Sequence, residues 1–133
     1  MEVIVEHLGA VQFEIKARQH TLISDQPAEN YGYDEGMTPP ELFLASLGSC
    51  AAFYAVEYLK RNHLEEGCKV RVRADKAKAP ARLDNFRIEI EVPAELNNDQ
   101  LKGVDQAVHR CLIHNTLLQP PTMSIEVKAP VLA

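Results

Sequence analysis

The sequence predicts one α+β domain with a mostly antiparallel sheet, and three observations support this fold class. The length of 133 residues corresponds to about one domain. Segments with alternating apolar and polar residues occur in runs instead of alternating singly with helices. Two longer segments have the apolar content and the boundary residues of helices. The predicted order is βββ-α-ββ-α-β, with residues 1–133 forming a single domain.

Short alternating segments define the predicted strands. The first three cover residues 3–6, 11–17 and 20–24, with a tight turn at Gly9-Ala10. A loop from Asp25 to Met37 follows, and its length is typical of a functional or mobile loop. Residues 70–74 and 86–92 would form a hairpin whose outer face pairs arginines with glutamates. Ser124–Lys128 is predicted as the last strand.

Two helices separate these strands. In the first, Thr38 is suited to the N-cap, Pro39 to the first helical position and Glu41 to the capping box. This helix should run to about Asn62 and be enclosed on nearly all sides, because its first four turns are almost wholly apolar. The second helix is predicted from Asp99 to Leu118 and is stopped by Pro120-Pro121.

A helix this apolar in a chain this small predicts a homodimer, because a single copy has few other residues to cover the helix on all sides. The two central helices would pack closely through small residues, namely Ala45, Gly48, Ser49, Ala51 and Ala52. The uncharged stretch from Leu42 to Val56 is 15 residues long, which is short of the roughly 20 that span a membrane.

Composition narrows the functional classes. Fourteen basic and nineteen acidic residues leave a net charge of -5, which argues against a nucleic-acid surface and against an anionic membrane. The N-terminus lacks the pattern of a signal peptide, and three cysteines form no CxxC pair and no even-numbered framework. We therefore expect a cytoplasmic protein with reduced thiols.

Cys50 and Cys111 are the residues best suited to chemistry. Cys50 lies in the middle of the apolar helix, so it is either an inert core thiol or a nucleophile activated by a cation from another element. Cys111 and His114 share a face of the second predicted helix, but no further ligand cluster accompanies them, so a metal site is disfavoured. Cys68 is interpreted as an incidental thiol.

Two motifs make a resemblance specific. The stretch from Thr38 to Cys50, TPPELFLASLGSC, resembles the central-helix motif of the OsmC/Ohr family of osmotically inducible and organic hydroperoxide resistance proteins. The stretch from Cys111 to Leu117, CLIHNTL, resembles that family's second-cysteine motif, and Asp25-Gln26-Pro27 and Gly36 fit its OsmC-like branch. The resemblance covers essentially the whole chain.

The resemblance implies an intertwined homodimer with thiol peroxidase activity. Cys50 would attack a hydroperoxide, Cys111 would then close a disulfide, and a lipoylated or thioredoxin-like protein would reduce it. No metal or organic cofactor is implied. Apolar residues would favour organic hydroperoxides over hydrogen peroxide, with Phe43, Phe53, Tyr54, Leu112 and Leu117 as candidates.

One departure concerns the groups that activate the thiol. Peroxidases of the family pair the reactive cysteine with an arginine and a glutamate, and Pro40 stands at the glutamate position here. Glu41 is one residue away and would face the opposite side of the helix, which favours its capping role. Arg18 is the candidate arginine, and His114 is a further candidate for a supporting role.

Two other functions remain open. The chain could be a non-catalytic dimer that binds an apolar small molecule or a protein, with both cysteines as packing residues. Metal-assisted hydrolysis at Cys111 and His114 is a third possibility.

Overall fold

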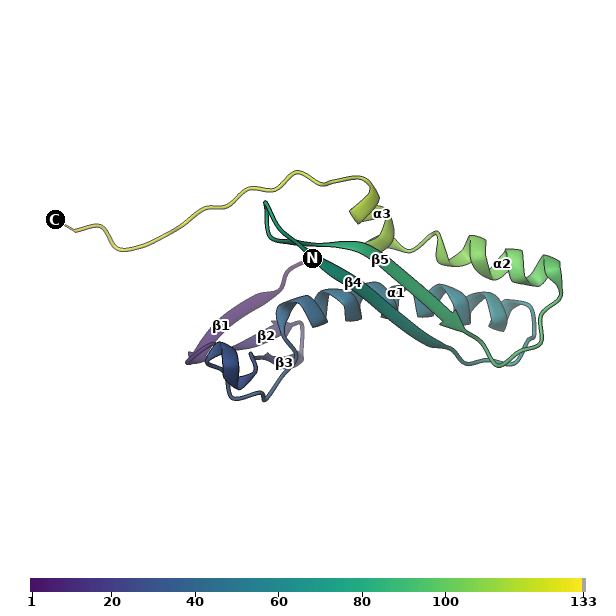
Figure 1. Ribbon diagram of the computed structural model, residues 1–133, viewed down its shortest axis with the longest axis horizontal. Coiled ribbons are helices and arrows are strands. Elements are labelled where there is room, and N and C mark those ends of the chain that lie inside the picture. Colours follow the sequence, from purple (N-terminus) through teal and green to yellow (C-terminus); the bar gives the residue numbers. More distant parts are fainter. Residues whose placement is uncertain (133) are drawn as a thin grey trace.

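The computed structural model describes residues 1–132 and confirms the α+β class, with two antiparallel sheets and three α-helices (Figure 1). In chain order the elements are β1 (Ile4–Gly9), β2 (Gln12–Ala17), β3 (His20–Ser24), a short 3-10 turn (Ala28–Asn30), α1 (Pro39–Arg61), β4 (Lys69–Ala77), β5 (Arg82–Glu91), α2 (Asn98–Val108) and α3 (Leu112–Leu118). The β1–β2–β3 sheet lies at one end of α1, whereas the β4–β5 hairpin crosses the helix.

The loop between β3 and α1 is organised around one buried carboxylate, Asp25. Its side chain accepts hydrogen bonds from the N–H groups of Gln26, Tyr33 and Glu35 and from the Gln12 side chain, at 2.7 to 3.2 Å. Burial alone would raise the pKa of Asp25, but these hydrogen bonds outweigh it and hold the pKa below its ordinary value. The long loop is therefore an ordered connection into α1.

Helix α1 begins as predicted. Thr38 and Glu41 form a complete capping box, Pro39 occupies the first turn, and the helix ends at Arg61 with Asn62 as its C-cap. Since Glu41 accepts a hydrogen bond from the Thr38 N–H, the structure supports its interpretation as a capping residue.

The prediction that α1 is enclosed on nearly all sides is wrong for a single copy of the chain. A stripe at four-residue spacing, Leu47, Ala51, Ala55 and Leu59, is fully buried. The opposite side remains open, and Phe53 is 61% exposed. By length and composition the helix could cross a membrane, but its buried stripe packs against protein elements, namely β4, β5, α2 and α3.

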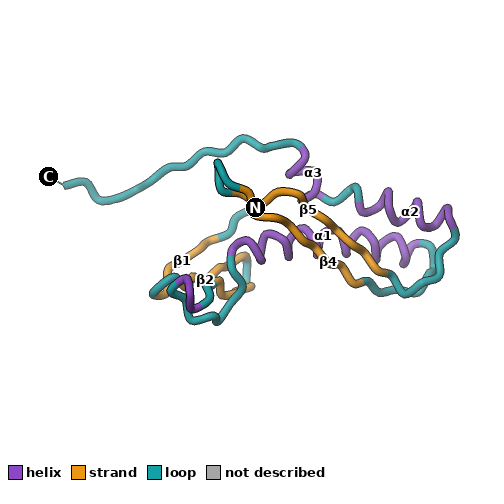
Figure 2. The backbone as a smooth tube through the Cα atoms, viewed as in Figure 1, coloured by secondary structure: helices purple, strands orange, loops and turns teal. Residues whose placement is uncertain are grey.

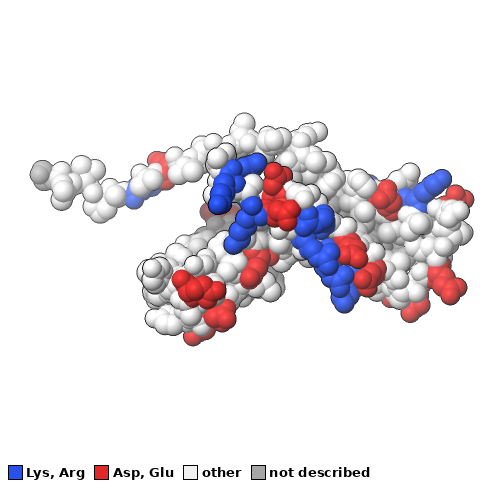
Figure 3. Space-filling model, viewed as in Figure 1, with Lys and Arg blue, Asp and Glu red and all other residues white. Residues whose placement is uncertain are grey.

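The β4–β5 hairpin has the predicted charge pairing. Arg71 lies opposite Glu89 in the register, and it forms ion pairs with Glu89 and Glu91 across the strands. Figure 3 shows blue basic and red acidic side chains next to one another over the middle of the molecule, where the hairpin lies in Figure 1. Exposed ion pairs of this kind each contribute about 0.2–1 kcal/mol to the stability of the fold.

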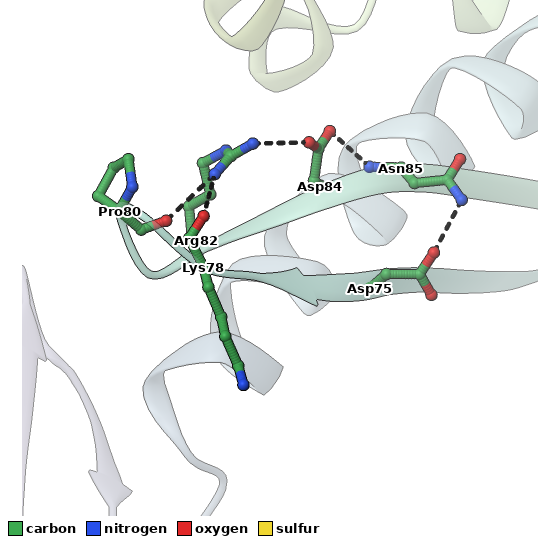
Figure 4. A network of polar contacts seen from close by, with 6 residues as sticks. All are labelled: Asp75, Lys78, Pro80, Arg82, Asp84 and Asn85. Carbon is green, nitrogen blue, oxygen red and sulfur yellow. Dashed lines mark hydrogen bonds and ion pairs between the residues drawn. The ribbon is translucent and has the colours of Figure 1, made fainter.

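A polar network holds the far end of this hairpin (Figure 4). Arg82 donates to the carbonyl oxygens of Lys78 and Pro80 and pairs with Asp84. Asn85 donates to Asp75 from the neighbouring strand. This end of the hairpin is thereby fixed by side chains of both strands.

The C-terminal third departs from the prediction in two ways (Figure 2). The single helix expected from Asp99 to Leu118 is interrupted, because residues 109–111 leave the helical path between α2 and α3. The strand expected at Ser124–Lys128 is not formed within the described residues; residues 119–132 run extended away from the body, and Ile125 is 86% exposed. A strand needs a pairing partner for its backbone groups, and this segment has none in one copy.

Candidate functional site

The structure brings the two motif cysteines together. Cys50, half-buried on α1, lies close enough to Cys111, which is only 1% exposed, for the two thiols to shift each other's pKa. Sixty residues of sequence separate them, and the packing of α2 and α3 against α1 closes the gap. Cys68 lies elsewhere, at the start of β4 among apolar neighbours, where burial raises its thiol pKa.

The interruption between α2 and α3 supplies the groups that surround the two sulfurs. Cys111 is the N-cap of α3, with a non-helical backbone, and its Sγ accepts from the N–H of His114 at 3.4 Å. The N–H groups of Leu112 and Ile113 lower the pKa of Cys50, and the N–H of Ile113 also lowers the pKa of Cys111. First-turn N–H groups have no partner inside their own helix, so they are free to bind sulfur. In a continuous helix these N–H groups would have donated to carbonyl oxygens of the preceding turn.

These contacts separate the acidities of the two thiols. Burial raises the pKa of Cys50, but hydrogen bonds from Cys111, Ile113 and Leu112 outweigh it, so its pKa is lowered overall. Burial also raises the pKa of Cys111, and the hydrogen bond to Cys50 raises it further. Of the two thiols, Cys50 therefore loses its proton more readily than Cys111.

A cavity of about 520 Å³ lies beside Cys111. Its wall is mostly apolar and comes from α1, β5, α2 and α3: Leu47, Ala51, Phe86, Ile88, Ile90, Leu101, Val104, Asp105, Val108, His109, Cys111, His114, Leu117 and Leu118. Of the apolar residues expected from the sequence to form a pocket, only Leu117 lines it, and Phe43, Phe53, Tyr54 and Leu112 do not. Phe53 lies on the open side of α1, whereas Phe43 lies one turn before Leu47 and packs against the ring of Phe86.

Arg110 is a cation near the site that the sequence analysis did not single out. Its guanidinium lies over the ring of Tyr54, 5.8 Å from the centroid. Tyr54 is one helical turn after Cys50, and Arg110 directly precedes Cys111. Only its position next to the second cysteine motif could have drawn attention to it.

The structure places the three candidates for a supporting role, Arg18, Glu41 and His114, in separate parts of the fold. Arg18 is exposed in the turn between β2 and β3, and within one copy the described residues show no interaction between it and Cys50. Glu41 is held by the capping box. His114 lies next to Cys111 and lines the cavity, so of the three supporting candidates it is the one that the structure brings to the thiol pair.

The comparisons with known proteins identify the family of the chain. The family model of OsmC-like proteins matches residues 32–126, which include both cysteines and well over half of the chain. The chain belongs to the OsmC-like protein family. No curated protein gives a significant match.

Solved structures of this family share the fold. The OsmC-like protein of Mycoplasma pneumoniae is 16% identical, with a TM-score of 0.77 and coverage of 90% of this chain and 87% of that one. A Psychrobacter arcticus protein named for osmotic stress and detoxification is 22% identical, with a TM-score of 0.77 and coverage of 86% and 85%. The organic hydroperoxide resistance protein OsmC of Legionella pneumophila is 17% identical, with a TM-score of 0.60 and coverage of 90% of each chain.

Proposed function

We propose that this OsmC-like protein is a thiol-dependent peroxidase that reduces organic hydroperoxides through Cys50 and Cys111. The observation that carries the proposal is the meeting of two thiols with opposite pKa shifts, lowered at Cys50 and raised at Cys111. The family membership and the hydroperoxide resistance named for the Legionella relative support the same chemistry.

The reaction has two steps. The Cys50 thiolate attacks the terminal oxygen of the hydroperoxide, so the O–O bond breaks, Cys50 becomes a sulfenic acid and the alkoxide leaves as an alcohol after taking a proton. The Cys111 thiol then attacks the sulfenic sulfur, which forms the disulfide and releases water. An external dithiol, from a lipoylated or thioredoxin-like protein, returns both sulfurs to thiols.

Cys111 has a double role in this sequence. As a thiol it donates to the Cys50 sulfur and stabilises the thiolate before attack. Because it already contacts Cys50, disulfide formation needs little movement of the backbone. The proposed enzyme needs no metal or organic cofactor for either step.

Thiol counting with cumene hydroperoxide tests the proposal. The reduced protein should lose two of its three thiols, and Cys50→Ser should lose none, because no nucleophile starts the reaction. Cys111→Ser should lose only the Cys50 thiol, whereas the control Cys68→Ser should still lose two. Unchanged thiol counts in the wild-type protein would contradict the peroxidase function.

The proposed working form is a homodimer. The open side of α1 exposes Phe53 together with small residues such as Ala45 and Ser49, which permit close packing of a second helix. The extended C-terminal segment keeps the alternation of a strand without a partner, and within one copy Arg18 contributes nothing to the pKa of Cys50. Sedimentation at twice the chain mass of 14.9 kDa would support this assembly, and sedimentation as a single chain would contradict it. A reducing compartment, the cytoplasm, suits these free thiols.

A non-catalytic binding function is the second candidate, and the apolar cavity is the observation that favours it. It predicts slow alkylation of Cys50 with the pH dependence of an ordinary thiol. Fast alkylation that persists below neutral pH would exclude it and support the peroxidase.

A further inference from the structure

The two sulfurs differ in their access to molecules outside the protein. Cys50 is half-buried on α1, whereas only 1% of the surface of Cys111 is exposed. Cys111 is covered by its own copy of the chain, because it caps α3, and α2 and α3 both pack against α1. A second copy adds contacts and leaves these in place, since most interfaces form with little movement of the backbone. Cys111 therefore stays buried in the proposed dimer.

The cavity beside Cys111 does not open a route to its sulfur. Cys111 belongs to the cavity wall, yet its exposed fraction is still 1%. Nδ1 of His114, another polar atom of this wall, is buried as well and has no hydrogen-bond partner among residues 1–132. Thiol–disulfide exchange requires direct contact between the attacking thiolate and a sulfur of the disulfide. A molecule in the cavity therefore meets apolar side chains and not the Cys111 sulfur.

Acidity alone would direct an attack on the disulfide to the buried sulfur. The thiol with the lower pKa leaves faster in thiol–disulfide exchange. Because the pKa of Cys50 is lowered and that of Cys111 is raised, this effect favours attack on Cys111 with Cys50 as the leaving group. Attack on a buried sulfur has to wait until the packing opens locally, which lowers the reactive population steeply in a packed core. Access and acidity oppose each other here, and access is the stronger effect.

We propose that the external dithiol reduces the Cys50–Cys111 disulfide by attacking Cys50, and that the burial of Cys111 determines this order. The inference rests on the proposed function, which also requires that a hydroperoxide reach Cys50. A thiolate of the dithiol forms a bond to Sγ of Cys50, the disulfide bond breaks, and the electron pair leaves on Sγ of Cys111. The N–H of His114, 3.4 Å from this sulfur, stabilises the leaving thiolate until it takes a proton.

The second step returns Cys50 to its reactive form. The other thiolate of the dithiol attacks the reductant sulfur of the mixed disulfide, so Cys50 leaves as a thiolate and the dithiol becomes a disulfide. Two electrons have then passed from the dithiol to the two cysteines. The lowered pKa of Cys50 makes it a good leaving group in this step.

Trapping of the mixed disulfide tests the order of attack. In the full-length Cys68→Ser protein, diamide oxidises the two remaining thiols to the disulfide without any peroxide. Exposure to 2-mercaptoethanol for several short times, quenching with excess N-ethylmaleimide and tryptic mass spectrometry then locate both labels. The first adduct should carry mercaptoethanol on Cys50 and maleimide on Cys111, with at least about a tenfold preference. Mercaptoethanol found first on Cys111 would overturn the proposed order.

A second measurement tests access without a disulfide. Methyl methanethiosulfonate reacts with the single thiol of two variants, Cys68→Ser/Cys111→Ser and Cys50→Ser/Cys68→Ser, and a pH series gives each rate for the fully ionised thiol. Cys111 should react at least about tenfold more slowly than Cys50 in the folded protein, and the two rates should converge in urea. Equal rates in the folded protein, or a difference that persists in urea, would contradict control by burial.

These outcomes are distinct from those of the peroxidase test, because diamide and the thiosulfonate replace the peroxide. Attack on Cys50 in a protein that loses no thiols to peroxide would retain the order of exchange and remove the peroxidase function. Thiol loss in peroxide together with attack on Cys111 would do the reverse.

Discussion

Replacement of Cys111 tests how the Cys50 thiolate is stabilised. Cys111→Ala removes the thiol that donates to Cys50, whereas Cys111→Ser keeps a donor at the same position. The N–H groups of Leu112 and Ile113 remain in both variants. Any difference between the two variants therefore reports the hydrogen bond from residue 111.

The size of the effect follows from the contact. A hydrogen bond to an ionised group contributes about 1.5–3 kcal/mol, and a weak donor near a half-exposed sulfur belongs at the lower end. A loss of about 1.4 kcal/mol reduces the thiolate population about tenfold. The remaining thiolate is more basic and more nucleophilic, with a Brønsted coefficient of about 0.4–0.5. The net result is alkylation of Cys50 about three- to fourfold slower in Cys111→Ala near neutral pH.

Iodoacetamide alkylation in a Cys68→Ser background measures this rate, since Cys50 is then the only cysteine left in either variant. The ultraviolet absorbance of the thiolate as a function of pH gives an independent value of its population. Cys111→Ser should react at close to the rate of the Cys68→Ser parent. If Cys111→Ala reacted as fast as Cys111→Ser, the hydrogen bond from residue 111 would not stabilise the thiolate.

Two further predictions concern stability. Because the pKa of Asp25 is lowered in the fold, its carboxylate stabilises the protein above the unfolded-state pKa of about 3.9, and this contribution is lost as the pH falls through the folded value. The free energy of unfolding, measured with urea, should therefore fall more steeply below about pH 5 in the wild-type protein than in Asp25→Asn. Parallel pH curves for the two proteins would contradict this prediction. Gly103→Ala would place a Cβ 2.1 Å from the hydroxyl oxygen of Tyr58. The overpacking costs about 1–3 kcal/mol, and the better helix propensity of alanine recovers about 1 kcal/mol, so the net destabilisation is about 1 kcal/mol. In a Tyr58→Ala background the same change should be neutral or stabilising in thermal unfolding, and stabilisation by Gly103→Ala in the otherwise wild-type protein would refute the close contact.

Several local features were predictable because they depend on near neighbours in the chain. Alternation identified the first five strands, and the arginine–glutamate pairing followed from their register. The start of α1 was predicted to the residue, since Thr38, Pro39 and Glu41 interact over three positions. Asp25 was noted only as part of a family motif, and its role as the acceptor at the centre of the loop required the fold.

The composition of the candidate site could be predicted only in part. The motifs identified Cys50 and Cys111, and the structure brings the two thiols into contact. The sequence did not predict the helix interruption at Cys111, because residues 109–111 contain no glycine, proline or usual N-cap residue. It also did not indicate the unpartnered nitrogen of His114 or the position of Arg110 over Tyr54, which depend on groups from other elements.

The strand alternation, the capped start of α1 and the two cysteine motifs can be read from the order of residues, since they depend on side-chain periodicity and on contacts within one turn. The position of the break in the second helix, and with it the set of N–H groups around the sulfurs, depends on packing between elements. The physical reason is that the helix interruption lacks a local signal and accompanies the burial of Cys111 in a core that includes the fully buried Leu47 and Ala51 of α1, about sixty residues earlier in the chain.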